Sequence, residues 1–364
     1  MGEAHVDPRC FPGDTGRVLP GRWPCRVRCD ATPLDPIEAV ASAFDTHQVV
    51  ALGEGNHGNL SGHAFRLALI RDPRFQGKVR DIVVEFGNAR WQTVMDRYVS
   101  GGEVDPAELK KVWQDTAQAN PVWDVPIYEE FFRAVRDANA ALPEDKQLRV
   151  ILGDVPFDWS AVRTVEDYNR QPQRSDIASA AIIRREVIDK GRKALLVFGD
   201  MHFLRRPVTM ATAGGTGSPG ERSIVSILED EGIAVFSIYT NSFFSMATVQ
   251  PGVAQWASPA LALLRGMPLG ATPLVSYQPV TFIVDGRPST IDPALSPRME
   301  DEFDAVLYIG APSTIRMALP SPTLCNDADY LAMRFFRMNL VGMAAQVEQA
   351  RQYCAAVGGT GPSG

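Results

Sequence analysis

The stretch Val49-Val50-Ala51-Leu52-Gly53-Glu54-Gly55-Asn56-His57-Gly58 decides what fold we expect. Its first four residues form an apolar run of strand length. The run lacks the alternation of a half-exposed strand, which indicates burial on both faces. The second half is a glycine-rich turn that carries an acid and a histidine. An apolar strand that ends in such a turn is typical of a parallel sheet that binds ligands at its carboxyl edge.

Further apolar runs of strand length follow along the chain, at 82–84, 150–152, 194–198, 233–236 and 305–309. Helical patterns separate them, at about 60–71, 89–99, 106–118, 124–141, 175–190 and 221–230. Strands that alternate with helices predict an α/β fold, with a doubly wound, mainly parallel sheet flanked by helices. The two helices within 100–141 exceed a simple crossover, so we expect a helical cap insertion there, beside the cleft.

The chain divides into an arm and one domain. Residues 1–34 are rich in proline, glycine, arginine and cysteine and predict an irregular N-terminal arm. A helix start signal follows, with Asp35 as the N-cap, Pro36 in the first turn and Glu38 in a capping-box position. We therefore predict a single α/β domain over 35–364.

Three later segments complete the predicted organisation. Residues 328–354 carry an apolar stripe and predict one long C-terminal helix that packs on the core. Residues 205–222 and 284–300 are rich in glycine or proline and predict irregular structure. The first of these is either a mobile lid over the cleft or a plain surface loop.

Composition excludes several classes of function. The chain has 364 residues, of which 45% are hydrophobic and 22% charged, and its formal net charge is −7. This balance is typical of a globular protein and does not predict nucleic acid as a partner. No stretch approaches the roughly 20 apolar residues of a transmembrane helix, so we predict no integral membrane segment. The N-terminus has no apolar signal core, which favours a cytoplasmic location over a trimmed secreted or periplasmic form.

The cysteines give little evidence of chemistry. Cys25 and Cys29 are spaced as C-x3-C, which is a poor zinc signature without a second pair. Free thiols are the expectation, with a disulfide in the arm as the alternative in an oxidising compartment. A Cys–His nucleophile is not expected, because no cysteine lies beside a histidine motif. The full set is Cys10, Cys25, Cys29, Cys325 and Cys354.

Acidic residues stand at the ends of four of the apolar runs: Glu54, Glu85, Asp154 and Asp200. The carboxyl ends of parallel strands lie on one edge of a sheet, where open α/β folds bind their ligands. We therefore expect these four side chains to converge. Glu54 and Glu85 are predicted to be catalytic, whereas Asp154 and Asp200 are predicted to contact substrate.

Histidines follow two of these acids. His57 comes three residues after Glu54, which places both on one side of a turn that leads into a helix. His202 comes two residues after Asp200, on one side of an extended segment. Both histidines are predicted to be catalytic. His63, on the following helix, and Asn88, after the second run, are predicted substrate contacts. His5 and His47 have no such context.

Common motifs for other mechanisms are absent from the sequence. It has neither the G-x-S-x-G of a serine nucleophile nor the H-E-x-x-H of a zinc protease. Residues 215–220 match the spacing of a phosphate-binding loop, but Glu221 stands where that loop requires a lysine.

The stretch 53–58, the later Glu85 and the motif Gly199-Asp200-Met201-His202 resemble the erythromycin esterase family. That family belongs to a broader group with ChaN-like haem-binding lipoproteins and Tiki-type proteases. The resemblance covers about residues 36–320. It implies a hydrolase-like α/β domain with an active site formed by Glu54, His57, Glu85 and His202.

The residues and the resemblance together suggest one main hypothesis and two alternatives. In the main hypothesis His57 activates water to attack an ester or related acyl bond of a small molecule, and no cofactor is required. In a second scheme Glu54, His57, Glu85 and His202 hold zinc or manganese. The resemblance leans against a required metal. In the third the fold binds haem or another ligand, as in ChaN-like proteins.

Trp113, Trp123 or Phe157 is expected to form an apolar wall for the substrate. The sequence does not predict an oligomeric state.

Overall fold

The computed structural model describes residues 29–207, 209–212, 215–216, 222–278, 281–284, 287–288 and 295–357. Most of the predicted arm, including Cys10 and Cys25, lies outside the described residues. The part at 29–34 contacts the domain, because Leu34 forms a β-bridge with Leu261. No helix of the described part is both long and apolar enough to cross a bilayer.

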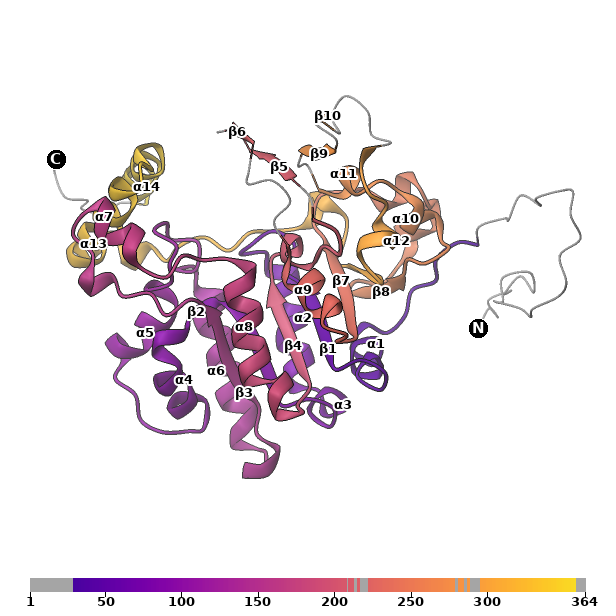
Figure 1. The fold of residues 1–364 in the computed structure, drawn as a ribbon, viewed down its shortest axis with the longest axis horizontal. Helices are drawn as coiled ribbons and strands as arrows, with labels where there is room; N and C mark the ends of the chain where they lie inside the picture. The colour runs from indigo at the N-terminus through magenta and orange to yellow at the C-terminus, as the bar shows by residue number, and fades with distance from the viewer. Residues whose placement is uncertain are drawn as a thin grey trace, which may run out of the picture.

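Within the described residues the main sheet has seven strands, in the order β3-β2-β4-β1-β7-β11-β8 (Figure 1). All neighbours are parallel except β11 and β8, which confirms the predicted α/β fold with a mainly parallel sheet. The strands are β1 Val49–Gly53, β2 Asp81–Asn88, β3 Arg149–Asp154, β4 Ala194–Phe198, β7 Val235–Asn241, β8 Ala260–Leu263 and β11 Ala305–Tyr308. Each apolar run named from the sequence overlaps a strand, although 233–234 precede β7 and 309 follows β11. The short antiparallel edge strand β8 was missed.

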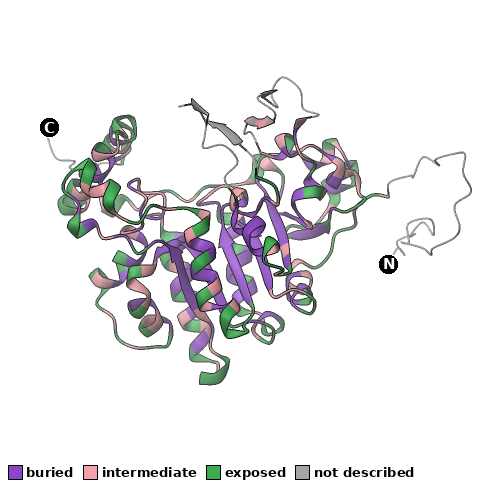
Figure 2. Cartoon of the chain, viewed as in Figure 1, coloured by how far each residue is buried: buried purple, intermediate pink, exposed green. Residues whose placement is uncertain are grey.

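The sheet is buried on both faces because alternate side chains of each strand enter different cores (Figure 2). In β1, Val50 and Leu52 enter one core while Val49 and Ala51 enter the other. The first core is covered by α1 Pro36–Ala43, α2 Leu60–Arg71, α3 Pro73–Gln76, α4 Gln92–Val99, α5 Pro106–Gln114 and α6 Pro126–Ala140. The second is covered by α8 Asp176–Glu186, α9 Ile224–Asp230, α10 Pro268–Ala271, α11 Leu274–Tyr277 and α12 Met299–Glu302.

The start of α1 agrees with the capping signal. The Asp35 side chain accepts hydrogen bonds from the backbone N–H groups of Ile37 and Glu38. These bonds satisfy two of the donors that a helix leaves unpaired at its amino end.

Strand order places a topological switch point between β1 and β4. The chain leaves β1 through α2 on one face and reaches β2, beyond β4. It leaves β4 through α9 on the other face and reaches β7, beyond β1. The two connections run on opposite faces of the sheet, and the carboxyl ends of such strands are the usual ligand position in open α/β folds.

The helices predicted within 100–141 are α5 and α6. They pack with α2 and α4 against the sheet. The connection 115–125 between them carries Trp123, whose ring meets that of His57 after β1.

The single C-terminal helix predicted over 328–354 is wrong. The chain forms two helices, α13 Ala328–Leu340 and α14 Ala344–Ala356. Gly342 between them has a φ of 78°, a left-handed conformation that favours glycine and ends the first helix. The predicted apolar stripe of α13 packs on α14 in a small core of its own.

A disulfide joins Cys325 to Cys354 and closes the α13–α14 pair into a hairpin, which we call the C-terminal hairpin (325–356). Cys29 is also disulfide-bonded. The expectation of free thiols is therefore wrong for these three cysteines.

The segments predicted to be irregular at 205–222 and 284–300 contribute strands to a second, antiparallel sheet of order β10-β9-β5-β6. Its strands are β5 Thr209–Thr212, β6 Gly215–Thr216, β9 Thr281–Val284 and β10 Arg287–Pro288. Figure 1 shows this sheet beyond the carboxyl edge of the main sheet. The prediction that 205–222 acts as a lid remains a prediction.

Candidate catalytic site

Three neighbouring strands bring the predicted catalytic residues together. Glu54 follows β1, Glu85 lies in β2, and His202 follows β4, which runs between the other two. The backbone N–H of Glu54 donates to the carbonyl of Phe198 in β4 at 2.9 Å. The backbone N–H of Gly199 donates to Glu85 Oε2 at 2.7 Å. The four side chains therefore share one edge of the sheet, as predicted.

Glu54 and His57 form the first pair of the site. His57 Nδ1 lies 2.9 Å from Glu54 Oε2. The carboxylate can only accept, so Nδ1 carries a proton, and in the neutral ring Nε2 presents a lone pair. Glu54 is fully buried, and Arg66 Nη2 lies 3.3 Å from its other oxygen. A buried charge needs such a partner, because an unpaired carboxylate loses its hydration without compensation.

Glu85 and His202 form the second pair. His202 Nε2 lies 3.3 Å from Glu85 Oε1, and His202 Nδ1 lies 2.5 Å from Asp176 Oδ1. Arg174 forms an ion pair with the same oxygen of Glu85. Its Nη2 also lies 3.2 Å from His202 Nε2. Two cationic groups thus converge on one buried carboxylate.

The surroundings set the protonation of each pair. Burial opposes the charge on Glu85, but His202 and Arg174 outweigh burial and hold the pKa of this carboxyl well below its usual range. Burial also opposes the charge on His202, yet the charge of Glu85 and the hydrogen bond to Asp176 raise the pKa of His202 to about 10. His202 is therefore an imidazolium at neutral pH.

The pKa of His57 is also raised. Burial lowers its pKa, but the hydrogen bond to Glu54 and the charge of Glu85 outweigh burial, and the net pKa lies above the ordinary value of 6.5. His57 therefore holds its proton more tightly than a free imidazole does, and it must lose that proton before Nε2 can act as a base.

The backbone of Gly199 leaves room for the His57 ring. A Cβ atom at this position would lie 3.2 Å from His57 Cε1 and 3.6 Å from Glu85 Oε2. The two pairs therefore face each other across Gly199. Any side chain there would crowd both.

Trp123 is the member of the predicted aromatic wall that reaches the site. Its ring is buried and meets the His57 ring edge to face, with centroids 4.7 Å apart. Trp113 packs on Phe132, and Phe157 packs on Trp159. Both are buried in the cores, so their contact with substrate stays a prediction.

The expected placement of Asp200 beside His202 is wrong. Residues Asp200–Phe203 form a 3-10 turn, not an extended segment, so the two side chains point to different partners. Asp200 Oδ2 accepts from Gly55 N at 2.9 Å and Oδ1 accepts from Thr240 N at 2.8 Å. Burial raises the pKa of Asp200 to about 7. The carboxyl fixes the turn that carries His57.

Asp154 and Asn88 lie opposite each other in β3 and β2. The amide of Asn88 donates to the carbonyls of Asp115 and Phe157, so it holds loops together. Asp154 Oδ2 accepts from Ala117 N at 2.6 Å. Its Oδ1 is buried without a hydrogen-bond partner in the described structure, and burial raises the pKa of Asp154 to about 6. Substrate contact by either residue stays a prediction.

His63 faces away from the His57 pair. It is buried on α2, and its Nε2 lies 3.0 Å from Glu130 Oε2 on α6. Burial and the nearby Arg66 lower the pKa of His63. Its position joins two helices, and its predicted role in substrate binding remains untested.

Sequence reasoning missed Arg66, Arg174 and Asp176. The sequence does carry a feature that points to Arg66, because it is a lone charge within the apolar run Phe65–Ile70 of α2, where a buried charge requires a partner. No feature of the sequence points to Arg174 or Asp176. They reach the site only because the connection from β3 to β4 passes the sheet edge where α8 begins, with Arg174 just before the helix and Asp176 as its first residue.

A metal ion is compatible with part of this geometry. One ligand atom each of Glu54, His57 and Glu85 lies within 4.8 Å of the others. However, the Glu54 carboxylate already faces Arg66 and His57. The Glu85 carboxylate already faces Arg174 and His202. A cation bound here would compete with these groups.

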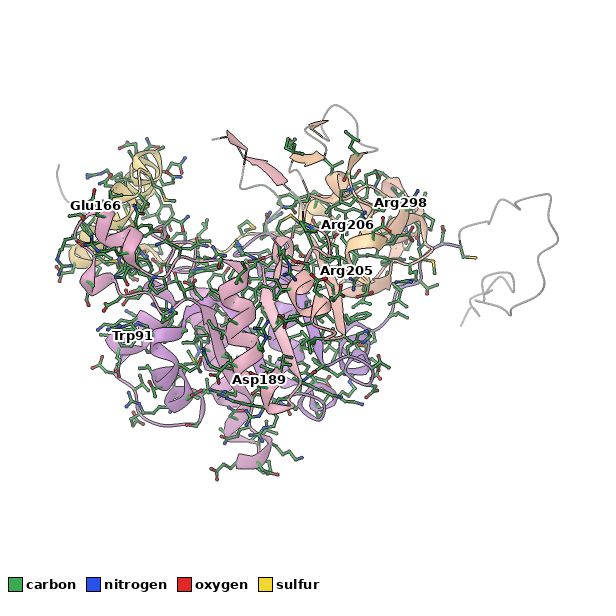
Figure 3. The ribbon with its side chains drawn as sticks, in the orientation of Figure 1. Trp91, Glu166, Asp189, Arg205, Arg206 and Arg298 are labelled. Atoms are coloured by element: carbon green, nitrogen blue, oxygen red, sulfur yellow. A yellow bond between two sulfur atoms is a disulfide. The ribbon has the colours of Figure 1, made fainter. Side chains whose placement is uncertain are left out.

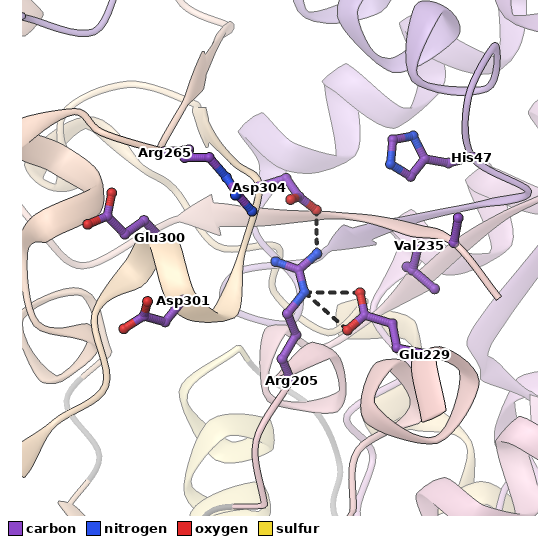
Figure 4. Close-up of a pocket in the computed structure, with 9 residues that line it drawn as sticks. His47, Arg205, Glu229, Val235, Arg265, Glu300, Asp301 and Asp304 are labelled. Carbon is purple, nitrogen blue, oxygen red and sulfur yellow. Dashed lines mark hydrogen bonds and ion pairs between the residues drawn. The ribbon is translucent and has the colours of Figure 1, made fainter. Parts of the chain in front are cut away.

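A charged cavity lies at the opposite edge of the sheet (Figure 4). It is lined by residues that precede strands, among them His47 before β1 and Asp304 before β11. Arg205 pairs there with Glu229 at 3.0 Å and with Asp304 at 2.6 Å. Figure 3 shows Arg205 and Arg206 in the same part of the molecule. This cavity is separate from the candidate site.

Comparisons with known proteins show the fold alone. Neither a protein-family model nor a curated protein sequence matches the chain. A solved succinoglycan biosynthesis protein is similar in structure, with a TM-score of 0.52 and 10% identity over 77% of this chain and 94% of its own. A protein from Bacillus cereus gives a TM-score of 0.49 with 13% identity, over 77% of this chain and 94% of its own. A mutant of the erythromycin esterase EreC in its open conformation gives a TM-score of 0.47 with 11% identity, over 78% of this chain and 94% of its own. The first similarity agrees with an α/β fold shared along most of the chain.

Proposed function

We propose that this protein is a hydrolase in which His57 activates water to cleave an ester or related acyl bond of a small molecule. The observation that carries the proposal is the pair of buried Glu54 and partly exposed His57, whose 2.9 Å bond orients the ring and leaves Nε2 of the neutral ring to accept a proton. The resemblance of residues 53–58 to the erythromycin esterases supports the same reaction.

The proposed reaction gives separate roles to the Glu54–His57 pair and to the Glu85–His202 pair. His57 Nε2 takes a proton from water, and the hydroxide attacks the acyl carbon. The charge that develops on the acyl oxygen is stabilised by the imidazolium of His202 and by Arg174. His57 then returns the proton to the leaving oxygen as the carbon–oxygen bond breaks, which yields an acid and an alcohol. No covalent intermediate is needed.

The decisive test compares His57→Ala with His47→Ala on a panel of p-nitrophenyl esters. His47 lies at the opposite edge of the sheet, so its variant controls for the loss of an imidazole. We expect His57→Ala to lose on the order of 10²–10⁴-fold in kcat, the usual contribution of a general base. Both variants should have the melting temperature of the wild type. Full activity in folded His57→Ala would reject the hydrolase proposal.

A metal-dependent hydrolase is a second candidate, because Glu54, His57 and Glu85 offer ligand atoms within 4.8 Å. These residues would hold zinc or manganese, and the ion would act as a Lewis acid that lowers the pKa of water. In this scheme chelator should abolish turnover, and added metal should partly restore Glu85→Gln. In the metal-free scheme chelator has no effect and Glu85→Gln is not rescued.

The ligand-binding alternative is tested during purification. A protein that binds haem would show a Soret band. Any slow ester hydrolysis that it shows would have the same rate in the wild type and in His57→Ala. Under the proposed function the partner is a small-molecule substrate and no haem is needed.

A further inference from the structure

A cavity of about 410 Å³ lies beneath the C-terminal hairpin. Its walls come from residues 120–122, from 320–325 and from one side of α13 and α14. None of the described side chains that line it carries a formal charge, and proline, leucine, valine and tyrosine form much of its surface. Its volume falls within the usual range for sites that bind small molecules.

One wall of the cavity is continuous with the catalytic turn. Figure 1 shows the chain after β11 crossing the carboxyl edge of the sheet on its way to the C-terminal hairpin. Ala318 N donates to Gly58 O at 2.8 Å, next to His57. Met317 and Leu319 follow the same path and are 42% and 67% exposed. Pro320, the next residue, already lines the cavity.

A second wall is also tied to the site. Val122 lines the cavity, and the next residue is Trp123, which meets the His57 ring. Asp124 then forms a buried ion pair with Arg334 of α13, with Nη2–Oδ1 at 2.5 Å. The cavity and the catalytic turn are therefore neighbours that share two segments of chain.

We infer that this cavity binds an uncharged, apolar arm of the substrate, such as a long acyl chain or an aromatic ring, while the scissile bond lies at His57. The inference rests on the proposed function. Burial of apolar surface in the cavity is favourable, at roughly 25 cal/mol per Å². A charged group would lose its hydration there and find no charged partner. The exposed Met317 and Leu319 extend the apolar path toward the site.

Binding is measured first without catalysis, by titration with N-phenyl-1-naphthylamine, an uncharged fluorescent probe. Ala350→Trp fills the cavity from α14, whereas Ala355→Trp on the same helix is exposed and does not line it. We expect Ala350→Trp to weaken probe binding by at least about tenfold, or roughly 1.4 kcal/mol. Ala355→Trp should bind as the wild type does. Leu324→Asp, which adds a charge to another wall, should also weaken binding.

The same variants are then compared on p-nitrophenyl acetate and octanoate. The wild type should prefer octanoate, and Ala350→Trp should lose that preference, whereas Ala355→Trp should keep the preference and the wild-type kcat on acetate. Equal probe binding by wild type, Ala350→Trp and Leu324→Asp would overturn the inference. So would an unchanged preference for octanoate in Ala350→Trp. If no ester is hydrolysed but the probe binds as expected, the proposed function fails and the cavity stands as a ligand site.

Discussion

At the residue scale, the predictable part of the site is the part that is local in sequence. Glu54 and His57 are three residues apart in a turn, and this spacing alone places their side chains in contact. Asp200 and His202 are also close in sequence, but the 3-10 turn separates them, and nothing in the sequence distinguishes that turn from an extended segment. Arg174 could not be predicted, because its contact with Glu85 depends on a crossover of the whole chain.

The first prediction concerns the pH dependence of turnover. A general base must be neutral, so kcat should rise with pH through the pKa of His57, which lies above 6.5. Glu54→Gln removes a negative charge that favours the imidazolium. The acid limb of the profile should therefore move to lower pH, and kcat should fall because the ring is less firmly oriented.

The control for this experiment is Glu130→Gln, which removes the same charge beside His63 instead of His57. Its acid limb should stay where the wild type has it. An acid limb in Glu54→Gln that coincides with that of the wild type would show that Glu54 does not set the pKa of the catalytic base.

At the element scale, long periodic segments were predicted well and short interruptions were not. The range of α2 could be read from its pattern, the start of α1 from its N-cap, and the buried strands from their apolar runs. The break between α13 and α14 depends on Gly342, a single residue inside a pattern that otherwise continues as a helix. The edge strand β8 has four residues, too few for its period to stand out.

The second prediction concerns the C-terminal hairpin. The disulfide between Cys325 and Cys354 closes a loop with a sequence separation of 29 residues, and loss of such a crosslink costs about 2–4 kcal/mol. Cys354→Ser should lower the free energy of unfolding by this amount in urea denaturation. Ala355→Ser, at the neighbouring exposed position, is the control and should change stability little. A stability of Cys354→Ser equal to that of the control would mean that the crosslink does not hold the hairpin.

At the scale of the whole molecule, the disulfides bear on location. Disulfides persist in oxidising compartments and are rare in the cytosol. The disulfides therefore favour the secreted or periplasmic alternative, and both locations stay predictions. Thiol alkylation of the protein in its native cells tests this alternative, because Cys325 and Cys354 should resist modification until a reductant is added.

The third prediction concerns how stability depends on pH. The pKa of His202 is raised from 6.5 to about 10 by Glu85 and Asp176, against the effect of burial. A group with a raised pKa in the folded state contributes stability that is fully present below its unfolded pKa. That contribution is lost as the pH rises from about 6.5 to 10. The melting temperature of the wild type should therefore fall across this range.

The variant His202→Asn keeps a polar side chain but cannot take up the proton. Its melting temperature should be lower than that of the wild type at pH 6 and should fall less steeply toward pH 10. His47→Ala is the control, because it lies away from the site and should keep the wild-type slope. Calorimetric scans at matched ionic strength measure all three proteins. If His202→Asn kept the wild-type slope, the imidazolium that we assign to the oxyanion would not exist, and Arg174 would be left as the cation of the site.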